Sequence, residues 1–414
     1  MTEGVVVRLS ELVSEGSVLI NDGYRTNTEE LGRPGLPILR VAEIQDGHLS
    51  PTFGDHVREE FRRKIGAKTS QCGDVVVTTK GTVGRIALVK DTDPEFVYSP
   101  QVCFIRVLDP RRVNPDFLYQ WFRGSEFSEQ ALAIQSQTDM APYINLADFR
   151  SLRVTLPSIT EQDAIAGVLG ALDDKIKSNR HKAELIDSIL QYEYLILREQ
   201  DGARTVPLGS LVKPALGGVW GSDEATEKEQ FRVSCFRGVD LASIARNDWP
   251  KPPTRWIRET QYAPRKFGSG EIWLEGSGSF CGRSLLISDS IQQLFEEPVC
   301  YSNFVKRLVP ISDPRLSVVS WLALRHAYNI GEVAQSRIGS AFPNLDLSAL
   351  LSNTEVLVPD DDDLNRLCQL TESRLDTQVL REDRILSELR DALLPELLSG
   401  RLRVKDAESM MENV

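Results

Sequence analysis

The sequence lacks the patterns of disulfide-linked, zinc-binding and membrane proteins. Its six cysteines lie far apart without a CxxC pair, and its four histidines do not cluster with them, so neither a disulfide framework nor a metal site is expected. No stretch approaches the roughly 18 consecutive apolar residues that cross a bilayer. The chain also begins without a basic segment followed by a long apolar core, so we expect a cytoplasmic protein.

Motifs for nucleotide binding and catalysis are also missing. There is no GxxxxGK[ST] phosphate loop, and the Asn-Pro-Asp-Phe at 114–117 lacks the second proline and the aromatic pairing of an amino-methyltransferase site. Asp74 and Lys80 lack the Glu-x-Lys arrangement of a metal-dependent nuclease. The glycines at 276–282 have the wrong spacing for a dinucleotide loop, and a β-rich run follows them. The sequence therefore favours binding over catalysis and predicts no catalytic residue and no cofactor in this chain.

Charge is unevenly distributed along the 414 residues. The net charge is −12, and ten of these excess negative charges fall in two segments, 158–202 and 359–414. The other two segments, 1–157 and 203–358, are near neutral and contain local basic clusters. This distribution permits nucleic-acid binding without demonstrating it. The 41% hydrophobic content is ordinary for a globular protein, and the length predicts two or three domains.

The two halves of the chain repeat the same order of short sequence features. Each half contains a strand, a glycine turn and a second strand, and it ends in an apolar-X-apolar-Pro step into a long helical stretch. The matched segments are 7–13 with 206–212, Tyr98-Ser99 with Tyr301-Ser302, and 154–157 with 356–359. A period this long indicates a domain-plus-helix module present in two divergent copies.

Two long helices are predicted, at 158–202 and within 359–414. Apolar residues of the first recur at coiled-coil spacing: Ile165, Leu169, Leu172, Ile176, Ala183, Ile186, Leu190 and Leu197. Ser158 or Thr160 is the expected N-cap, the aspartates at 360–363 suit the start of the second helix, and Gly400 is an expected C-cap. Asn179 falls on the apolar seam, where it either fixes the helix register or faces solvent near a partner.

Antiparallel pairing of these helices brings the chain back toward its first domain. We therefore predict an α+β fold, with two similar α/β domains at 1–157 and 203–358 separated by two long antiparallel coiled-coil helices and related by a pseudo-twofold axis. Duplex DNA has a backbone dyad of the same kind, and paired readers contact half-sites about one turn apart. A generic dimerisation hairpin is the alternative reading of the helices.

Two matched regions carry candidate DNA-binding residues. The glycine turns hold hydrogen-bond donors suited to phosphate, although a hairpin needed by the fold explains the turns equally well: Lys80, Thr82 and Arg85 in the first half, and Ser277, Ser279 and Arg283 in the second. The polar loops before each long helix contain Gln135, Gln137 and Arg337. Glutamine can bond adenine edges and arginine can grip guanine, but ordinary surface polarity also accounts for these side chains.

Two further segments resemble the specificity subunit of type I restriction-modification systems. The run Leu-Pro-Ser-Ile-Thr-Glu-Gln at 156–162 is similar to the start of that family's first spacer helix, and Leu-Leu-Pro-Glu-Leu-Leu-Ser-Gly-Arg-Leu at 393–402 is similar to its C-terminal signature. The order of duplicated domains, glycine turns and helices extends the resemblance over nearly the whole chain. The second helix departs from the pattern, since it starts with aspartates in place of Glu-Gln.

The resemblance implies a non-catalytic subunit of a DNA-modification and phage-defence complex. Two target-recognition domains would each read one part of a bipartite, asymmetric sequence of double-stranded DNA. The implied partners are two methyltransferase subunits, which use S-adenosylmethionine, and restriction subunits, which use ATP and Mg²⁺; none of these cofactors is expected in this chain. Residues predicted to dock the partners are Ile165, Leu169, Leu172, Ile176, Leu375 and Leu389.

Two other functions remain open at this point. The acidic helices suit a coiled-coil inhibitor or DNA mimic that occupies the cleft of a DNA-binding partner. Scattered Asp, Glu and Lys residues leave a nuclease as a third hypothesis.

Overall fold

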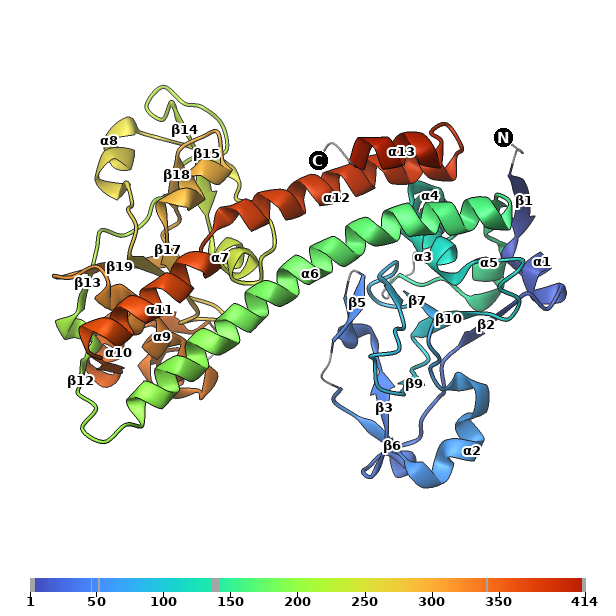
Figure 1. Cartoon of the computed structure of the whole chain (residues 1–414), viewed down its shortest axis with the longest axis horizontal. Coiled ribbons are helices and arrows are strands. Elements are labelled where there is room, and N and C mark those ends of the chain that lie inside the picture. The colour runs from blue at the N-terminus through green and yellow to red at the C-terminus, as the bar shows by residue number, and fades with distance from the viewer. Residues whose placement is uncertain (1–3, 46, 51–52, 136–141, 340–341, 412–414) are drawn as a thin grey trace. The chain divides into compact units, whose positions relative to one another are not determined.

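The computed structural model describes residues 4–45, 47–50, 53–135, 142–339 and 342–411. The chain divides into two compact units. Unit 1 comprises Met1–Asp174 and Ser387–Val414, and unit 2 comprises Lys175–Leu386. Both units therefore contain part of each long helical segment (Figure 1). The domain boundaries given above stay a prediction.

Unit 1 is built on a four-stranded antiparallel sheet. Its order is β2 (Val18–Asp22), β10 (Val102–Val107), β7 (Val75–Thr78) and β8 (Ile86–Leu88). A three-stranded sheet has the order β6 (His56–Arg58), β3 (Gly35–Leu39) and β9 (Val97–Tyr98), with β3 and β9 parallel. Two short pairs complete the strands: β1 (Val5–Arg8) with β11 (Arg153–Leu156), and β4 (Ile44–Gln45) with β5 (His48–Leu49). All four β7 side chains are buried, as the valine-rich strand sequence requires.

The helices of unit 1 are mostly short. They are α1 (Leu9–Ser14), α2 (Arg62–Ile65), α3 (Pro115–Arg123), α4 (Ser125–Ile134), α5 (Leu146–Ser151) and α13 (Val404–Met411), together with the unit 1 parts of α6 and α12. The Asn114 side chain accepts a hydrogen bond from the Phe117 backbone NH, so this asparagine caps α3.

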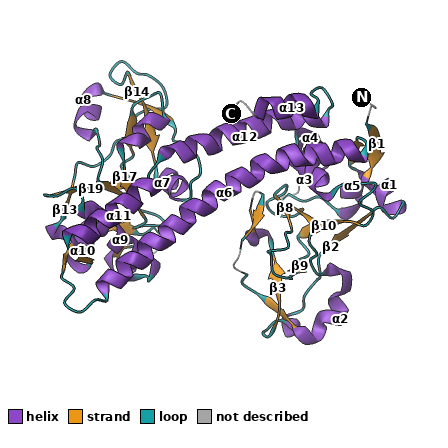
Figure 2. Ribbon diagram, viewed as in Figure 1, coloured by secondary structure: helices purple, strands orange, loops and turns teal. Residues whose placement is uncertain are grey.

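Unit 2 repeats this architecture with its own strands (Figure 2). The four-stranded sheet has the order β13 (Val212–Pro214), β19 (Val305–Pro310), β16 (Glu271–Glu275) and β17 (Ser284–Ile287). The three-stranded sheet has the order β15 (Thr254–Ile257), β14 (Phe231–Phe236) and β18 (Val299–Tyr301), with β14 and β18 parallel. The short pairs are β12 (Thr205–Pro207) with β22 (Glu355–Leu357), and β20 (Arg337–Ile338) with β21 (Asn344–Leu345).

The unit 2 helices are α7 (Gly238–Ala245), α8 (Glu259–Tyr262), α9 (Leu316–Asn329), α10 (Leu347–Asn353) and α11 (Asp361–Arg374), together with the unit 2 parts of α6 and α12. α9 lies against β17 and α11 (Figure 2), and the apolar core between them includes Trp321 and Leu367. The sheet orders β2-β10-β7-β8 and β13-β19-β16-β17 correspond strand for strand. The predicted α+β fold with two similar domains is therefore confirmed.

The first long helix is α6, which runs without a break through the 40 residues Ile159–Arg198. It begins in a capping box, because the Glu161 NH donates to the Ser158 hydroxyl and the Ser158 NH donates back to the Glu161 carboxylate. Of the two candidate N-caps, the structure therefore selects Ser158. The predicted seam is buried throughout its length, except that Ile186 is half-buried.

The second helical segment is divided, which corrects the expectation of one continuous partner helix. α11 ends at Arg374, and α12 (Thr377–Leu398) begins after a short break. The break falls at Leu375 and Asp376. Asp360 caps α11 by accepting from the Asp363 NH, as its aspartate run predicted, and Gly400 lies just beyond α12 with a φ of 70°.

Ion pairs show that the helical segments run antiparallel within unit 2. Going along α6, Lys175 pairs with Glu382 (3.0 Å), Asp187 with Arg374 (3.1 Å) and Glu193 with Arg366. The residue numbers in the second helical segment fall as those in α6 rise, which is the signature of antiparallel packing. Asn179 is buried on the same seam and donates to Asp383 Oδ1 at 2.7 Å, so it takes the register-fixing role and not the exposed one.

No helix among the described residues is long and apolar enough to span a membrane.

Candidate nucleic-acid interface

In unit 1, three turns come together at one rim. We call residues 78–85, 99–102 and 142–144 the unit 1 rim. Backbone hydrogen bonds join them: Gly84 N to Thr78 O (3.0 Å), Thr79 N to Gln101 O (3.0 Å), Gly81 N to Pro142 O (3.2 Å) and Ile144 N to Thr79 O (2.9 Å). Lys80 also forms an isolated β-bridge with Tyr143. The glycine turn is thus fixed by backbone bonds on both sides, which leaves its side chains free to face outward.

Unit 2 repeats these contacts at matched positions. Its rim comprises residues 275–283, 302–305 and 343–345. The corresponding bonds are Gly282 N to Glu275 O (2.8 Å), Gly276 N to Phe304 O (2.7 Å), Gly278 N to Pro343 O (3.0 Å) and Leu345 N to Gly276 O (2.9 Å). Ser277 bridges Asn344 as Lys80 bridges Tyr143. The two rims therefore share one backbone design.

Glycine is required at two points of the unit 2 rim. Gly282 has a φ of 94°, and a Cβ there would lie 2.2 Å from Val333 Cγ1. A Cβ on Gly276 would lie 2.6 Å from the Phe304 carbonyl oxygen. These glycines let the turn approach its neighbours closely, which supports the hairpin reading of the glycine pattern.

The side chains carried by the matched positions differ between the units. Lys80 is exposed where unit 2 has the half-buried Ser277, and Gln101 is exposed where unit 2 has Phe304. Thr82 and Ser279 are both exposed on their turns. These positions can therefore present different chemistry on the same backbone.

Arg85 and Arg283 occupy equivalent positions but are both engaged within the chain. The Arg85 guanidinium donates to the carbonyls of Val41 (3.4 Å) and Ile44 (3.2 Å). Arg283 pairs with Glu275 at 3.1 Å and lies over the Phe280 ring. Each arginine is half-buried, and its guanidinium contacts groups of its own unit.

The residues predicted in the pre-helix loops have different locations. Arg337 belongs to β20 and pairs with Leu345, so it borders the unit 2 rim. Gln135 follows α4 and makes no hydrogen bond to the described residues of the unit 1 rim, and Gln137 lies outside the described residues. Contact with DNA stays a prediction for all nine candidate residues.

Sequence reasoning missed Gln101, Phe304 and Phe280. Gln101 and Phe304 each follow a matched Tyr-Ser pair by two residues, so the repeated Tyr98-Ser99 and Tyr301-Ser302 could have located them. Phe280 lies in a turn that is one residue longer than its unit 1 counterpart, which obscured the match.

The four α6 residues predicted to dock partners are buried in the chain itself. Ile165, Leu169, Leu172 and Ile176 are each at most 5% exposed, and Leu375 and Leu389 are half-buried. The four form the protein's own helix seam and offer no free surface. A different set of α6 side chains is exposed in unit 2: Leu185, Ile189, Tyr192 and Ile196. Their spacing of four, three and four residues places them on one face of the helix, which we call the α6 stripe.

Gln162 explains why the Glu-Gln pair suits the start of α6. Its side chain is almost fully buried in unit 1. Its carbonyl oxygen accepts from the Asn114 NH at 2.9 Å, while its amide donates to the carbonyl of Pro157 at 3.0 Å. The glutamine thus ties the helix to the domain, next to the cap formed by Glu161.

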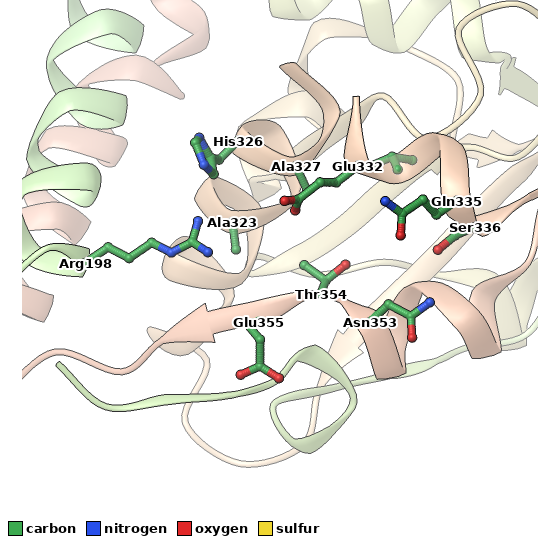
Figure 3. A pocket seen from close by; sticks show the side chains of 11 residues that line it. Arg198, Ala323, His326, Ala327, Glu332, Gln335, Ser336, Asn353, Thr354 and Glu355 are labelled. Carbon is green, nitrogen blue, oxygen red and sulfur yellow. The ribbon is translucent and has the colours of Figure 1, made fainter. Parts of the chain in front are cut away.

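A pocket of about 240 Å³ lies in unit 2 (Figure 3). Side chains from α6, α9 and the segment before β20 converge on it, including Arg198, His326, Glu332 and Gln335. Burial and the nearby Arg198 hold the pKa of His326 below its ordinary value. Since the lining mixes both signs of charge, it lacks the basic character of a DNA-binding surface.

Comparisons with known proteins agree with this duplicated architecture. Residues 5–188 match the family model described as "Type I restriction modification DNA specificity domain". The MjaVIII specificity subunit of Methanocaldococcus jannaschii is 24% identical over 187 residues, which cover 44% of this chain and 42% of that protein. The MjaIX specificity subunit of the same organism is 22% identical over 379 residues, covering 85% and 82%.

A solved structure shows the same fold. The type I restriction-modification S subunit from M. genitalium has a TM-score of 0.54 and 17% identity, with 95% of each chain covered. These relatives are specificity subunits, which agrees with the prediction of a specificity component and does not favour the inhibitor or nuclease hypotheses. The chain is therefore similar to type I restriction-modification specificity subunits, through the domain match at residues 5–188 and through the likeness to MjaIX over 85% of its length.

Proposed function

We propose that this chain is the DNA sequence-recognition subunit of a type I restriction-modification complex and reads a bipartite, asymmetric target. One observation carries the proposal: the two rims share their backbone hydrogen bonds but differ in side chains. A shared backbone lets both units approach DNA in the same way, and different side chains let them select different bases.

The unit 1 rim would read its half-site through polar groups. Lys80 can bind phosphate or guanine, and Gln101 can form paired bonds with the N6 and N7 atoms of adenine. Both side chains are exposed and make no side-chain hydrogen bond or ion pair among the described residues. Unit 2 lacks both groups at the matched positions, which supports an asymmetric target.

The α6 stripe would receive a methyltransferase subunit. Its four apolar side chains are 40–66% exposed, and exposed apolar groups arranged on one helix face mark interaction surfaces. The complex would contain two methyltransferase subunits using S-adenosylmethionine, and restriction subunits using ATP and Mg²⁺. The helical segments would set the gap between half-sites. No cofactor is proposed for this chain.

The function is tested by co-expressing the chain with its methyltransferase subunit and mapping N6-methyladenine across the host genome. We expect a bipartite motif with an undefined gap, and replacement of residues 1–157 by those of a relative should change one half only. The double variant Lys80→Ala with Gln101→Ala should relax the same half, whereas the exposed Lys228→Ala, away from both rims in sequence, should not. A stable complex that leaves DNA unmethylated, or methylates it without sequence preference, contradicts the proposal.

The docking surface is tested by co-purification. Leu185→Ser with Tyr192→Ser should weaken binding of the methyltransferase subunit. The control Lys182→Ser with Glu184→Ser changes exposed polar residues of the same helix and should leave binding intact. Equal recovery of the partner with both double variants would place the interface elsewhere.

A further inference from the structure

The unit 2 rim exposes large apolar side chains that the unit 1 rim lacks. Phe280 is 56% exposed, Phe304 is 58% exposed, and Phe342, next to the third turn, is 81% exposed. At the position matched to Phe304, unit 1 has Gln101. Isolated exposed apolar residues are common, but several aromatic rings gathered on adjoining turns indicate a binding surface.

Phe280 is held in its exposed position by its neighbours. The next residue, Cys281, is fully buried in the core with Val333 and Leu345, so the turn directs Phe280 outward. Arg283 lies over the Phe280 ring, 4.2 Å from its centre, and Arg283 Nε lies 3.1 Å from Glu275 Oε1. A ring that is already ordered in the free protein loses little side-chain entropy when it binds a partner.

Phe304 is fixed beside the same glycine turn. Its carbonyl accepts from the Gly276 NH, and the absence of a Cβ on Gly276 allows this approach. The same absence accommodates the Lys306 side chain, since a Cβ would lie 2.9 Å from Lys306 Cγ and Cε. Lys306 has no ion pair among the described residues and adds a positive charge to the strand that follows Phe304, beside Gly276.

This combination suits DNA better than an apolar protein surface. Lys306 and Arg337 supply cations for phosphate, while the rings supply apolar contact for bases. The apolar parts of a base pair are the thymine methyl group in the major groove and the base faces of an opened step.

We propose that unit 2 reads its half-site by apolar contact of Phe280 and Phe304 with the bases, whereas unit 1 reads by polar contact. This inference rests on the proposed function and assigns the recognition chemistry of one of its two halves. The target of unit 2 is thus distinguished by thymine methyl groups or by a step that opens readily, and not by a pattern of hydrogen bonds alone.

The test uses the complex with the methyltransferase subunit and the duplex that methylation mapping identifies. Each thymine of the unit 2 half is replaced in turn by deoxyuridine, which lacks the methyl group, and 2-aminopurine is placed at each step of that half to report unstacking. The protein variants are Phe280→Ala, Phe304→Ala and the control Ile311→Ala. Ile311 is an exposed apolar residue directly after β19. Phe304 lies directly before β19, at the opposite end of the strand.

We expect each phenylalanine variant to bind the duplex about fivefold or more weakly, while Ile311→Ala binds within twofold of wild type. For methyl recognition, deoxyuridine should weaken wild-type binding but should have little further effect on the phenylalanine variants. For base-face contact, 2-aminopurine fluorescence should rise with wild type and not with the variants. Deoxyuridine in the unit 1 half should affect all proteins equally.

Three results would overturn the inference. These are phenylalanine variants that bind within twofold of wild type, wild type that responds to neither base substitution, and variants that lose the methyltransferase subunit while keeping DNA selectivity. In each of these cases, unchanged selectivity for the unit 1 half of the target would leave the proposed function intact. Loss of selectivity in both halves of the wild-type target would instead refute the function itself.

Discussion

Arg106 donates two hydrogen bonds of 2.7 Å to the two carboxylate oxygens of Asp74, and both residues are buried in unit 1. Arg307 repeats this bidentate contact with Glu271 in unit 2, at 2.6 and 2.5 Å. A tyrosine joins each pair: Tyr98 donates to Asp74, and Tyr301 accepts from Arg307. The repeat places a matching charged pair at the start of β7 and of β16, the strands whose other ends lead into the glycine turns.

The first prediction concerns these pairs. Arg106→Lys should lower the free energy of unfolding by about 2–3 kcal/mol, because an ammonium group cannot keep both carboxylate bonds and the bond to the Thr69 carbonyl. Arg307→Lys should have a similar effect. Urea denaturation measures both, and Arg111→Lys at an exposed site is the control. A loss below about 0.5 kcal/mol, as expected for surface pairs, would show that the buried contact is not stabilising.

The second prediction concerns the unit 2 turn. Gly282→Ala should destabilise the protein by about 2–4 kcal/mol, because the added Cβ meets Val333 and the φ of 94° is unfavourable for alanine. Adding Val333→Ala should reduce the Gly282→Ala penalty by relieving the steric part. Gly217→Ala is the control, since a Cβ there has open space. Thermal or urea unfolding measures all four proteins, and no penalty for Gly282→Ala would mean that the turn rearranges.

The third prediction concerns Asp173 on α6. Although burial works in the opposite direction, Arg123, Gln120 and Arg390 together hold the pKa of Asp173 below its ordinary value of 3.8. The folded state therefore favours the charged form. Its stabilisation is present above pH 3.8 and is lost as the pH falls through the lowered pKa.

Asp173→Asn should accordingly cost about 2 kcal/mol near pH 7, and the cost should shrink on acidification below the ordinary pKa. Denaturation curves at several pH values measure the difference from wild type. The neighbouring Asp174→Asn is the control, because Asp174 is exposed and lies 3.9 Å from its lysine partner. If the stability loss caused by Asp173→Asn did not change with pH, it would come from altered packing and not from the lost charge.

The fourth prediction gives Asp383 on α12 the opposite pH dependence. Burial raises the pKa of Asp383 above its ordinary value, despite hydrogen bonds from Asn179 and Asn247. The folded state therefore takes up a proton more readily than the unfolded state. This proton uptake favours folding fully below pH 3.8, and the benefit is lost as the pH rises through the raised pKa.

Asp383→Asn should thus lie within about 1 kcal/mol of wild type at pH 7, because it removes a buried charge while keeping the shape. On acidification, wild type should gain stability relative to the variant. The exposed Glu372→Gln serves as the control in the same unfolding series. A variant that becomes relatively more stable in acid would contradict the raised pKa.

Much of the architecture was determined by local sequence. The spacing of Ile165, Leu169 and Leu172 specified a buried helix seam, and Ser158 with Glu161 specified where the helix begins, because both depend on contacts a few residues apart. The repeated Tyr-Ser pairs and glycine turns identified two copies of one domain. The family resemblance likewise depended on short runs at the helix start and near the C-terminus.

Tertiary structure alone decided which side chains are available for binding. Arg85 and Arg283 have the same sequence context, yet their guanidinium groups are held by Val41 and Ile44 in one unit and by Glu275 in the other. Local pattern cannot reveal this, because the partners of Arg85 lie about 40 residues away. Phe280 and Phe304 belong to a residue type that is usually buried. They are exposed because Cys281 occupies the core and the backbone bond from Gly276 to Phe304 fixes the two turns together, contacts that form only when the chain has folded.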